Sequence, residues 1–298
     1  MVERYELEAF LTLAEELHFG RAAERLHVST ARVSQTIKKL ERKVGVPLFD
    51  RSSRRVELSA VGRQLHEEIR PAWELIGAAV ERAIETGKGI TGTLTVAFVG
   101  PAGGQLVMGA AEEFRARQPG CAVDIKEAQL GDVVPWLREG VADLALTGFP
   151  MDAAGVVAGP VLVREVRMLA VPAGHPFARR TWVSVEDLAR VPVLRLPESV
   201  PESHRADRTP RRTPAGRAIA PGPVAATLHE ILTLVGAGRG VFPVGAQTRR
   251  YHPRPDVAYV PFGDAAPVEW GLMWRSGGGS ARVLAFARAA GDLLAAHR

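Results

Sequence analysis

The sequence has one cysteine, Cys121, and no long apolar run. A single cysteine excludes a disulfide within the chain and a cluster of thiolate metal ligands. A redox sensor also needs a second thiol, so we interpret Cys121 as a small strand residue. No segment approaches the roughly 18 apolar residues that a membrane span needs, and the N-terminal MVERYELE lacks the regions of a secretion signal. These absences predict a cytoplasmic protein with no membrane partner.

Residue patterns for catalysis and metal binding are also missing. The eight histidines include no pair at the i, i+4 spacing of a helical zinc site, and no Gly-x-Ser-x-Gly nucleophile turn occurs. The run from Gly236 to Gly240 imitates half of a dinucleotide fingerprint. It follows a predicted helix and precedes a strand, which is the wrong order for a phosphate site. We therefore predict no catalytic residue, no metal and no cofactor.

The chain has 298 residues, and its composition is that of an ordinary globular protein, with 46% hydrophobic and 24% charged side chains. This length predicts two to three structural units.

Positive charge is unevenly placed along the sequence. From Arg21 to Arg63 there are 11 Lys or Arg against 4 acidic residues, a local charge of +7, although the whole chain carries only +5. A concentrated basic segment of this kind is typical of a DNA-binding unit.

Two predicted helices joined by a tight turn occupy residues 20–41, and Ser29 is suited to cap the second. Apolar side chains of this second helix repeat at helical spacing and predict one buried stripe: Val33, Ile37, Leu40 and Val44. An ordinary amphipathic helix with a solvated basic face would fit the same stripe. The neighbouring segments favour a DNA-binding fold. Two short runs around a basic turn follow, and an apolar helix precedes, with one face made by Tyr5, Leu7, Phe10, Leu11, Ala14 and Leu17.

Four runs in about the first 65 residues resemble a known family: LEAFLTLAEELHFGRAAERLHVS, VSQTIKKLE, VGVPLFDR and RRVELSAVG. They resemble the N-terminal winged helix-turn-helix of LysR-type transcriptional regulators, almost without gaps. The resemblance implies that residues 1–58 bind double-stranded DNA at a two-fold operator, with the second helix in the major groove. The helix and the following wing are expected to supply the contacts: Ser29, Thr30, Arg32, Ser34, Gln35, Lys38, Lys39, Arg51, Arg54 and Arg55.

Residues 59–89 are predicted to form a long helix followed by a hinge. Apolar residues in this helix alternate spacings of four and three: Leu65, Ile69, Ala72, Ile76, Ala79 and Ala83. The helix is too long for the small domain before it to cover, so we expect it to pair with a copy of itself. In LysR-type regulators this segment is the dimerising linker helix, and the expected assembly is a homodimer or homotetramer. Pro71 is expected to kink the helix.

After the hinge, short apolar strands alternate with helices. The order strand, helix, strand, helix, strand is predicted over 93–147, and a similar alternation, beginning with one strand at 164–171, continues to the C-terminus. Alternation of this kind predicts an α/β fold with parallel strands. Within it, the segment from Pro197 to Pro223 has six prolines and five arginines and is predicted to be an irregular loop. The arginines either lie on a solvated surface or face a ligand cleft or another subunit.

The resemblance implies a more specific architecture for residues 90–298. LysR-type regulators have a C-terminal effector-binding domain with two α/β lobes, similar to type II periplasmic binding proteins. Lobe I is then expected at about 90–161 and 267–298, and lobe II at about 162–266. The chain would cross twice between the lobes and form a cleft for a small molecule.

The turn from Gly100 to Gly104 ends the first strand of this domain and begins a helix predicted from about Gly103. Its backbone N–H groups therefore lie at the sheet edge where α/β proteins bind ligands, although a glycine turn without a ligand would have the same sequence. Family members bind effectors in the matching loop. No acidic residue lies between Thr93 and Met108, so we expect an anionic effector. The expected effector-binding residues are Gly100, Pro101, Ala102, Gly103, Gln129, Thr147 and Arg195.

The sequence therefore predicts a LysR-type transcriptional regulator, not an enzyme. Its operator binding or its activation of transcription would be modulated by a small-molecule effector. The alternative is a small-molecule (solute) binding protein whose basic N-terminal module does something other than regulate genes. DNA protection at a defined two-fold site distinguishes the two, because a solute-binding protein would protect no such site.

Overall fold

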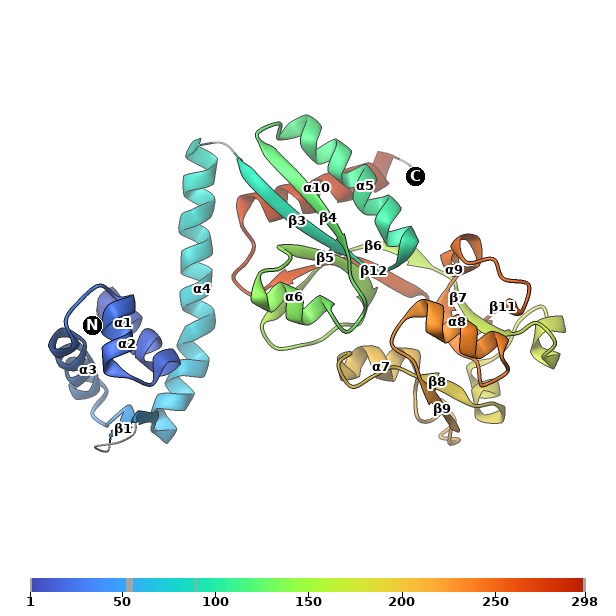
Figure 1. Cartoon of the computed structure of the whole chain (residues 1–298), viewed down its shortest axis with the longest axis horizontal. Coiled ribbons are helices and arrows are strands. Elements are labelled where there is room, and N and C mark those ends of the chain that lie inside the picture. The colour runs from blue at the N-terminus through green and yellow to red at the C-terminus, as the bar shows by residue number, and fades with distance from the viewer. Residues whose placement is uncertain (1, 52–55, 89, 297–298) are drawn as a thin grey trace. The chain divides into compact units, whose positions relative to one another are not determined.

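The computed structural model describes residues 2–51, 56–88 and 90–296. The chain divides into two compact units, Met1–Gly77 and Ala78–Arg298, and Figure 1 labels most of their helices and strands. No helix within the described ranges is long and apolar enough to cross a membrane.

The first unit contains three helices, α1 (Arg4–Glu16), α2 (Phe19–Arg25) and α3 (Thr30–Val44). Helix α3 begins as predicted, because the Ser29 hydroxyl accepts a hydrogen bond from the Arg32 N–H at 3.2 Å. It ends at Gly45, whose φ of +87° favours glycine. Strands β1 (Phe49–Arg51) and β2 (Val56–Leu58) then pair antiparallel. Three helices followed by this ribbon form the predicted winged helix-turn-helix.

One apolar core holds this unit together, with Phe10, Leu13, Ile37 and Leu40 almost completely buried. The predicted apolar faces are wrong at their ends, because Tyr5, Leu17 and Val44 are exposed. Tyr5 lies in the first turn of α1, Leu17 lies just beyond the end of α1, and Val44 lies in the last turn of α3. The chain leaves the core at each of these points. The face of α1 also buries a charged residue, Glu6, which apolar periodicity does not predict.

Helix α4 (Ala60–Lys88) continues on both sides of Pro71. Its first part does not belong to an exposed seam. Leu65 and Ile69 pack, together with Trp73, against the core of the first unit, so their assignment to the seam was wrong. The small domain covers more of the helix than its size indicated. Apart from Val61 in the first turn, which is 43% exposed, the large exposed apolar side chains lie further along the helix: Leu75, Ile76, Val80 and Ile84, each 49–59% exposed.

The second unit contains a five-stranded sheet in the order β4-β3-β5-β12-β6. As predicted, β3 (Gly92–Phe98), β4 (Cys121–Glu127) and β5 (Leu144–Phe149) are parallel. The late strand β12 (Val268–Arg275) returns to this sheet and pairs antiparallel with both β5 and β6 (Val156–Glu165). We call this sheet and its helices the larger lobe.

Helices cover both faces of the five-stranded sheet. Helices α5 (Gly100–Arg117) and α10 (Ala281–Ala296) pack on one face over a core that includes Phe114 and Phe286. Helix α6 (Val133–Glu139) packs on the other face (Figure 1), where it buries its own Val134 and Leu137. Helix α5 starts at Gly100, three residues earlier than predicted, so the whole glycine turn belongs to its first turn.

A three-stranded antiparallel sheet, in the order β10-β7-β11, forms the centre of what we call the smaller lobe. Its strands are β7 (Arg167–Pro172), β10 (Phe242–Gly245) and β11 (Val257–Pro261). Helices α8 (Leu228–Gly236) and α9 (Gln247–Tyr251), and a parallel pair of strands, β8 (Val193–Arg195) and β9 (Pro221–Val224), complete it. The chain crosses between the lobes after β6 and again before β12.

Two segments differ from the sequence prediction. The single strand predicted at 164–171 is two strands, β6 and β7, which separate at the exposed Val166 and join different sheets. Strand β6 contains Pro160, and a proline is tolerated there because β6 is an edge strand. The irregular loop predicted from Pro197 to Pro223 contains a helix, α7 (Glu202–Arg208), and the start of β9. Its prolines lie outside the helix.

Candidate DNA-binding surface and ligand cleft

The exposed face of α3 carries most of the DNA-contact residues that the sequence predicted. Thr30, Arg32, Gln35 and Lys38 are exposed and Ser34 is half-buried, whereas the opposite side of the helix is buried in the core. Ser29 is exposed as well, but its hydroxyl caps the helix. Neither Arg32 nor Lys38 forms an ion pair within the described part of the chain. These side chains are therefore available to a nucleic acid.

Lys39 differs from its neighbour Lys38. Its ammonium group lies 3.1 Å from a Glu6 carboxylate oxygen and 2.6 Å from the Tyr5 hydroxyl, and Lys43 contacts the same carboxylate at 2.7 Å. Burial alone raises the pKa of Glu6. Hydrogen bonds from the Glu3 N–H, Lys43 and Lys39 outweigh it and lower that pKa from 4.5 to about 2. Glu6 is thus a buried anion that holds α1 against α3.

Other basic residues of this unit are also neutralised locally. Arg21 pairs with Glu16 at 3.1 Å, and Arg25 pairs with Glu15 and Glu16 at 2.7 and 3.2 Å. These acids precede the basic segment in the sequence, so a charge count from Arg21 onward does not include them. The positive surface left for DNA is consequently narrower than the sequence indicated.

Of the three arginines predicted for the wing, the structure describes one. Arg51 is the last residue of β1 and pairs with Val56 of β2. Arg54 and Arg55 lie outside the described residues.

The second unit has a cavity of about 230 Å³ lined by residues from both lobes. The larger lobe contributes Val99, Gly100 and Pro101 at the start of α5, together with Gln129 and Gly148. The smaller lobe contributes helices α7 and α8 and strand β10, including Ile231 and Phe242. We call this cavity the cleft. It lies at the carboxyl ends of parallel strands, where α/β proteins bind ligands.

The cleft brings together only part of the predicted effector site. Gly100, Pro101 and Gln129 line it. Ala102 and Gly103 line another cavity of about 430 Å³, because the first turn of α5 directs them elsewhere. Thr147 is fully buried in β5, and its hydroxyl has no hydrogen-bond partner in the described structure. Arg195 was placed wrongly, since it ends β8 beside a cavity of about 250 Å³ that also includes Arg205 and Arg211.

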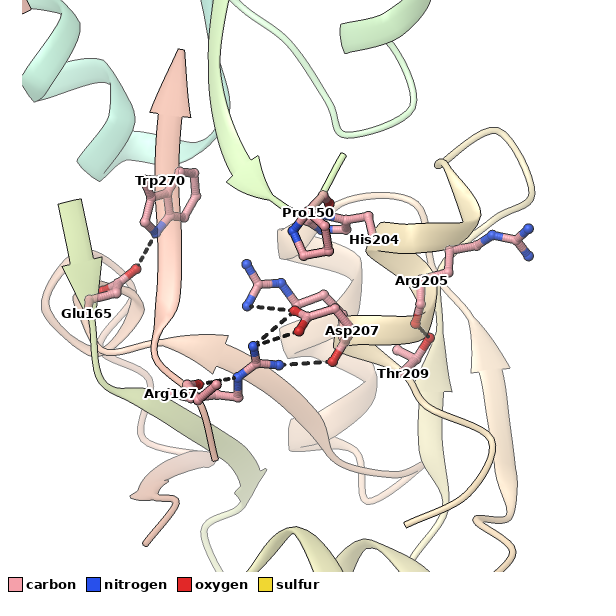
Figure 2. Close-up of polar contacts among 10 residues, drawn as sticks. Pro150, Glu165, Arg167, His204, Arg205, Asp207, Thr209 and Trp270 are labelled. Atoms are coloured by element: carbon pink, nitrogen blue, oxygen red, sulfur yellow. Dashed lines mark hydrogen bonds and ion pairs between the residues drawn. The ribbon is translucent and has the colours of Figure 1, made fainter. Parts of the chain in front are cut away.

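Sequence patterns did not single out His204, His252 or Trp270, which also line the cleft, and they offered Arg208 only as one of five arginines in residues 197–223. His204 and Arg208 lie four residues apart on α7 and so share one face of that helix. Burial, and then the Arg208 charge, lower the pKa of His204 to about 4, while its Nδ1 lies 3.0 Å from the Pro150 carbonyl oxygen (Figure 2). An i, i+4 His–Arg pair in a Pro-rich stretch is a signal that could have indicated the helix.

Two family profiles match the chain: the bacterial regulatory helix-turn-helix of the lysR family over residues 5–63, and the LysR substrate binding domain over residues 87–295. The HTH-type regulator AlsR of Bacillus subtilis is 32% identical, but the match covers only 65% of this chain and 64% of AlsR. IlvR of Caulobacter vibrioides is 30% identical over 89% of this chain and 90% of IlvR.

A solved structure also resembles the whole chain. An OxyR mutant from Corynebacterium glutamicum, in a form with hydrogen peroxide bound, is 27% identical, with a TM-score of 0.54 over 100% of this chain and 98% of that one. The substrate-binding profile alone matches well over half of the residues, and the helix-turn-helix profile accounts for the unit before it. The chain therefore belongs to the LysR family, and it is a DNA-binding transcriptional regulator with an effector-binding domain.

Proposed function

We propose that a small molecule bound in the cleft modulates how this regulator binds its operator or activates transcription. The observation that carries the proposal is that both lobes line one cavity while the chain crosses between them only twice. A ligand that contacts both lobes stabilises one relative position of the lobes over others. Gly100, Pro101 and Gln129 would contact it from the larger lobe, and α7 and α8 from the smaller one.

On the DNA side, we assign the major groove to α3. Thr30, Arg32, Ser34 and Gln35 would contact base edges, and Lys38 and Lys39 would contact phosphates, with wing arginines near the flanking groove. The division of labour that we propose is DNA binding by residues 1–58, dimerisation by 59–89 and ligand sensing by 90–298.

The exposed apolar side chains of α4 support the dimerisation assignment. Leu75, Ile76, Val80 and Ile84 are about half exposed, and Ile76, Val80 and Ile84 recur every four residues along one side of the helix. Large apolar side chains in such a row favour burial against another chain. A second copy of the same helix is the partner that a two-fold operator requires.

We infer regulation and not catalysis. Among the described residues that line the cleft there is no serine, cysteine or lysine. A peroxide-sensing role, which the OxyR likeness brings to mind, is disfavoured by this chain's single cysteine, since Cys121 is only 2% exposed. An effector that binds without covalent chemistry fits the cleft better.

Footprinting of the full chain on genomic DNA tests the proposal, combined with a thermal-shift screen of metabolites. We expect protection of two half-sites, and at least one stabilising metabolite should change the extent or pattern of protection. Protection that never responds to a stabilising metabolite would refute modulation through the cleft. Absence of any two-fold site would favour the solute-binding alternative.

A further inference from the structure

The cleft contains a largely buried guanidinium, one nitrogen of which is fully buried and has no hydrogen-bond partner in the described structure. Arg208 is the last residue of α7, its side chain is only 7% exposed, and it lines the cavity. Within the described residues its guanidinium donates no hydrogen bond, and its buried Nη1 lies 3.7 Å from Asp207 Oδ2. A charged group removed from water without hydrogen bonds is strongly destabilising. The described chain therefore supplies no hydrogen-bond acceptor for this guanidinium, and a ligand could supply one.

Acidic groups near Arg208 are already engaged. Arg167 Nη2 lies 2.9 and 3.0 Å from the two Asp207 carboxylate oxygens, and Arg167 Nη1 donates to the Asp207 carbonyl (Figure 2). Glu165 accepts from Trp270 Nε1 at 2.5 Å and from the Gln247 N–H at 2.7 Å. Both carboxylates thus offset the positive charge of Arg208, but neither accepts a hydrogen bond from it in the described structure.

The surrounding residues leave space for the guanidinium and keep it charged. A Cβ atom at Gly148 would lie 2.8 Å from Arg208 Nη2, so the group rests against a glycine that leaves it room. Burial and the charge of Arg167 lower the pKa of Arg208 to about 10, which still leaves it protonated at neutral pH. The neighbouring His204 is neutral at that pH, because its pKa is about 4. Arg208 is consequently the cation of α7 that faces the cleft.

The opposite wall of the cleft favours the same kind of ligand. Gly100 and Pro101 bring the positive end of α5 to the cavity, and no side chain caps this helix. The remaining lining is largely apolar, with Val99, Ile231 and Phe242 among it. Glu127, the acidic side chain in the lining, is exposed.

We propose, on the basis of the function proposed above, that the effector is a small carboxylate with an apolar body, and that Arg208 receives its carboxylate group. The two oxygens of a carboxylate match the parallel N–H groups of a guanidinium. The apolar body would lie against Ile231 and Phe242, and a cavity of about 230 Å³ limits it to a small molecule. Arg208 thus takes the role for which the sequence offered Arg195 or an arginine of residues 205–217.

The proposal has a consequence for the protein without ligand. Arg208→Met removes a largely buried cation that donates no hydrogen bond within the described residues. It also removes the 3.7 Å ion pair with Asp207, which stays paired with Arg167. The variant should therefore melt at a higher temperature than the wild type while losing carboxylate binding. A structural arginine would behave in the opposite way, because its loss would lower the melting temperature.

Calorimetry and thermal shift on the full chain test the ligand class. The probes are hexanoate, phenylacetate and 3-methylbutanoate, each paired with its primary amide, together with hexylamine. At least one carboxylate should bind, and its amide should bind about tenfold or more weakly, because a hydrogen bond to a charged group contributes about 1.5–3 kcal/mol. Arg208→Met should weaken that carboxylate by a similar factor and leave its amide unchanged.

Two further variants keep the test decisive. Arg205→Met removes an arginine from the same helix that lines a different cavity, so carboxylate binding should persist. Gly148→Ala should displace the Arg208 guanidinium and weaken carboxylates selectively, which serves if Arg208→Met does not fold. The inference is wrong if no carboxylate binds, if amides or hexylamine bind as well as carboxylates, or if Arg208→Met binds carboxylates normally. Operator protection by the wild type, measured in parallel, tests the proposed function separately.

Discussion

Adjacent lysines of α3 show how much a residue's role depends on distant partners. Lys38 is exposed and makes no ion pair in the described structure, whereas Lys39 contacts the buried Glu6 and the Tyr5 hydroxyl. Sequence periodicity places both lysines on the polar side of the helix, and Lys38 is indeed exposed there. It could not indicate that Lys39 has a carboxylate partner 33 positions earlier, because a buried acid on an apolar face has no periodic signal.

Base recognition by α3 can be separated from phosphate contact by two substitutions. Gln35→Ala should change the preferred base at one position of each half-site, at a cost of about 1–3 kcal/mol. Lys38→Ala should weaken all sequences alike and reduce the salt dependence of binding by about one unit of slope. Selection from a randomised operator library, repeated at several salt concentrations, measures both effects. A uniform loss in both variants would mean that this face does not enter the groove.

Acid sensitivity of the first unit is expected from Glu6. Its pKa is lowered from 4.5 to about 2 in the folded state, so its carboxylate stabilises the fold above pH 4.5 and loses that contribution as the pH falls toward 2. Glu6→Gln should therefore melt several degrees below the wild type at pH 7, and the gap should close at low pH. Circular dichroism melts across this range provide the measurement.

Glu8→Gln is the matched control for Glu6→Gln, since Glu8 lies on the same helix and forms no ion pair in the described ranges. Its melting temperature should stay close to that of the wild type at every pH. A gap for Glu6→Gln that is independent of pH would show that the ionised carboxylate is not what stabilises the fold.

At the scale of helices and strands, long periodic segments were predicted well and short or composite ones were not. Helices α3 and α4 and the parallel strands β3 to β5 were correct, because capping residues and sustained apolar patterns mark them. Strand β6 and helix α7 were missed. Their prolines and arginines resemble loop sequence. Pairing with β12 holds β6 at the sheet edge, and contacts such as that of Arg167 with Asp207 hold α7.

Assembly through α4 is expected to depend on its exposed apolar residues and not on Ile69, which packs inside its own unit. Ile76→Asp combined with Val80→Asp should give monomers, because each would place a charge in an apolar interface. Affinity for a two-site operator should then fall by about 10²–10⁴, the gain that linkage of two sites supplies, while half-site affinity stays the same. Sedimentation and binding assays measure the two quantities.

An apolar control distinguishes interface from fold in this experiment. Ile76→Leu combined with Val80→Leu keeps the side chains apolar and should leave the dimer intact. A dimer that survives the double aspartate change would exclude this part of α4 as the interface.

At the scale of the whole molecule, the sequence predicted two segments that line the cleft but did not choose among the arginines. The glycine turn before α5 and Gln129 follow predicted parallel strands, and both reach the cleft because the carboxyl ends of such strands share one sheet edge. Choosing the arginine across the cleft required the path of residues 197–223. Arg195 ends a strand directed to another cavity, whereas Arg208 follows on a helix whose face closes the cleft. The spacing of His204 and Arg208 could indicate the helix, but where that helix lies depends on tertiary packing.

Response to peroxide tests whether the likeness to OxyR extends to signal chemistry. Cys121 begins β4 inside the larger lobe and is 2% exposed, so peroxide has little access to its sulfur, and the chain has no second thiol to form a disulfide. Operator affinity and melting temperature should therefore be unchanged by hydrogen peroxide, in the wild type and in Cys121→Ala alike. Footprinting and thermal melts before and after treatment measure this. A peroxide response that Cys121→Ala abolishes would overturn the expectation, because it would require the lobe to open and expose β4.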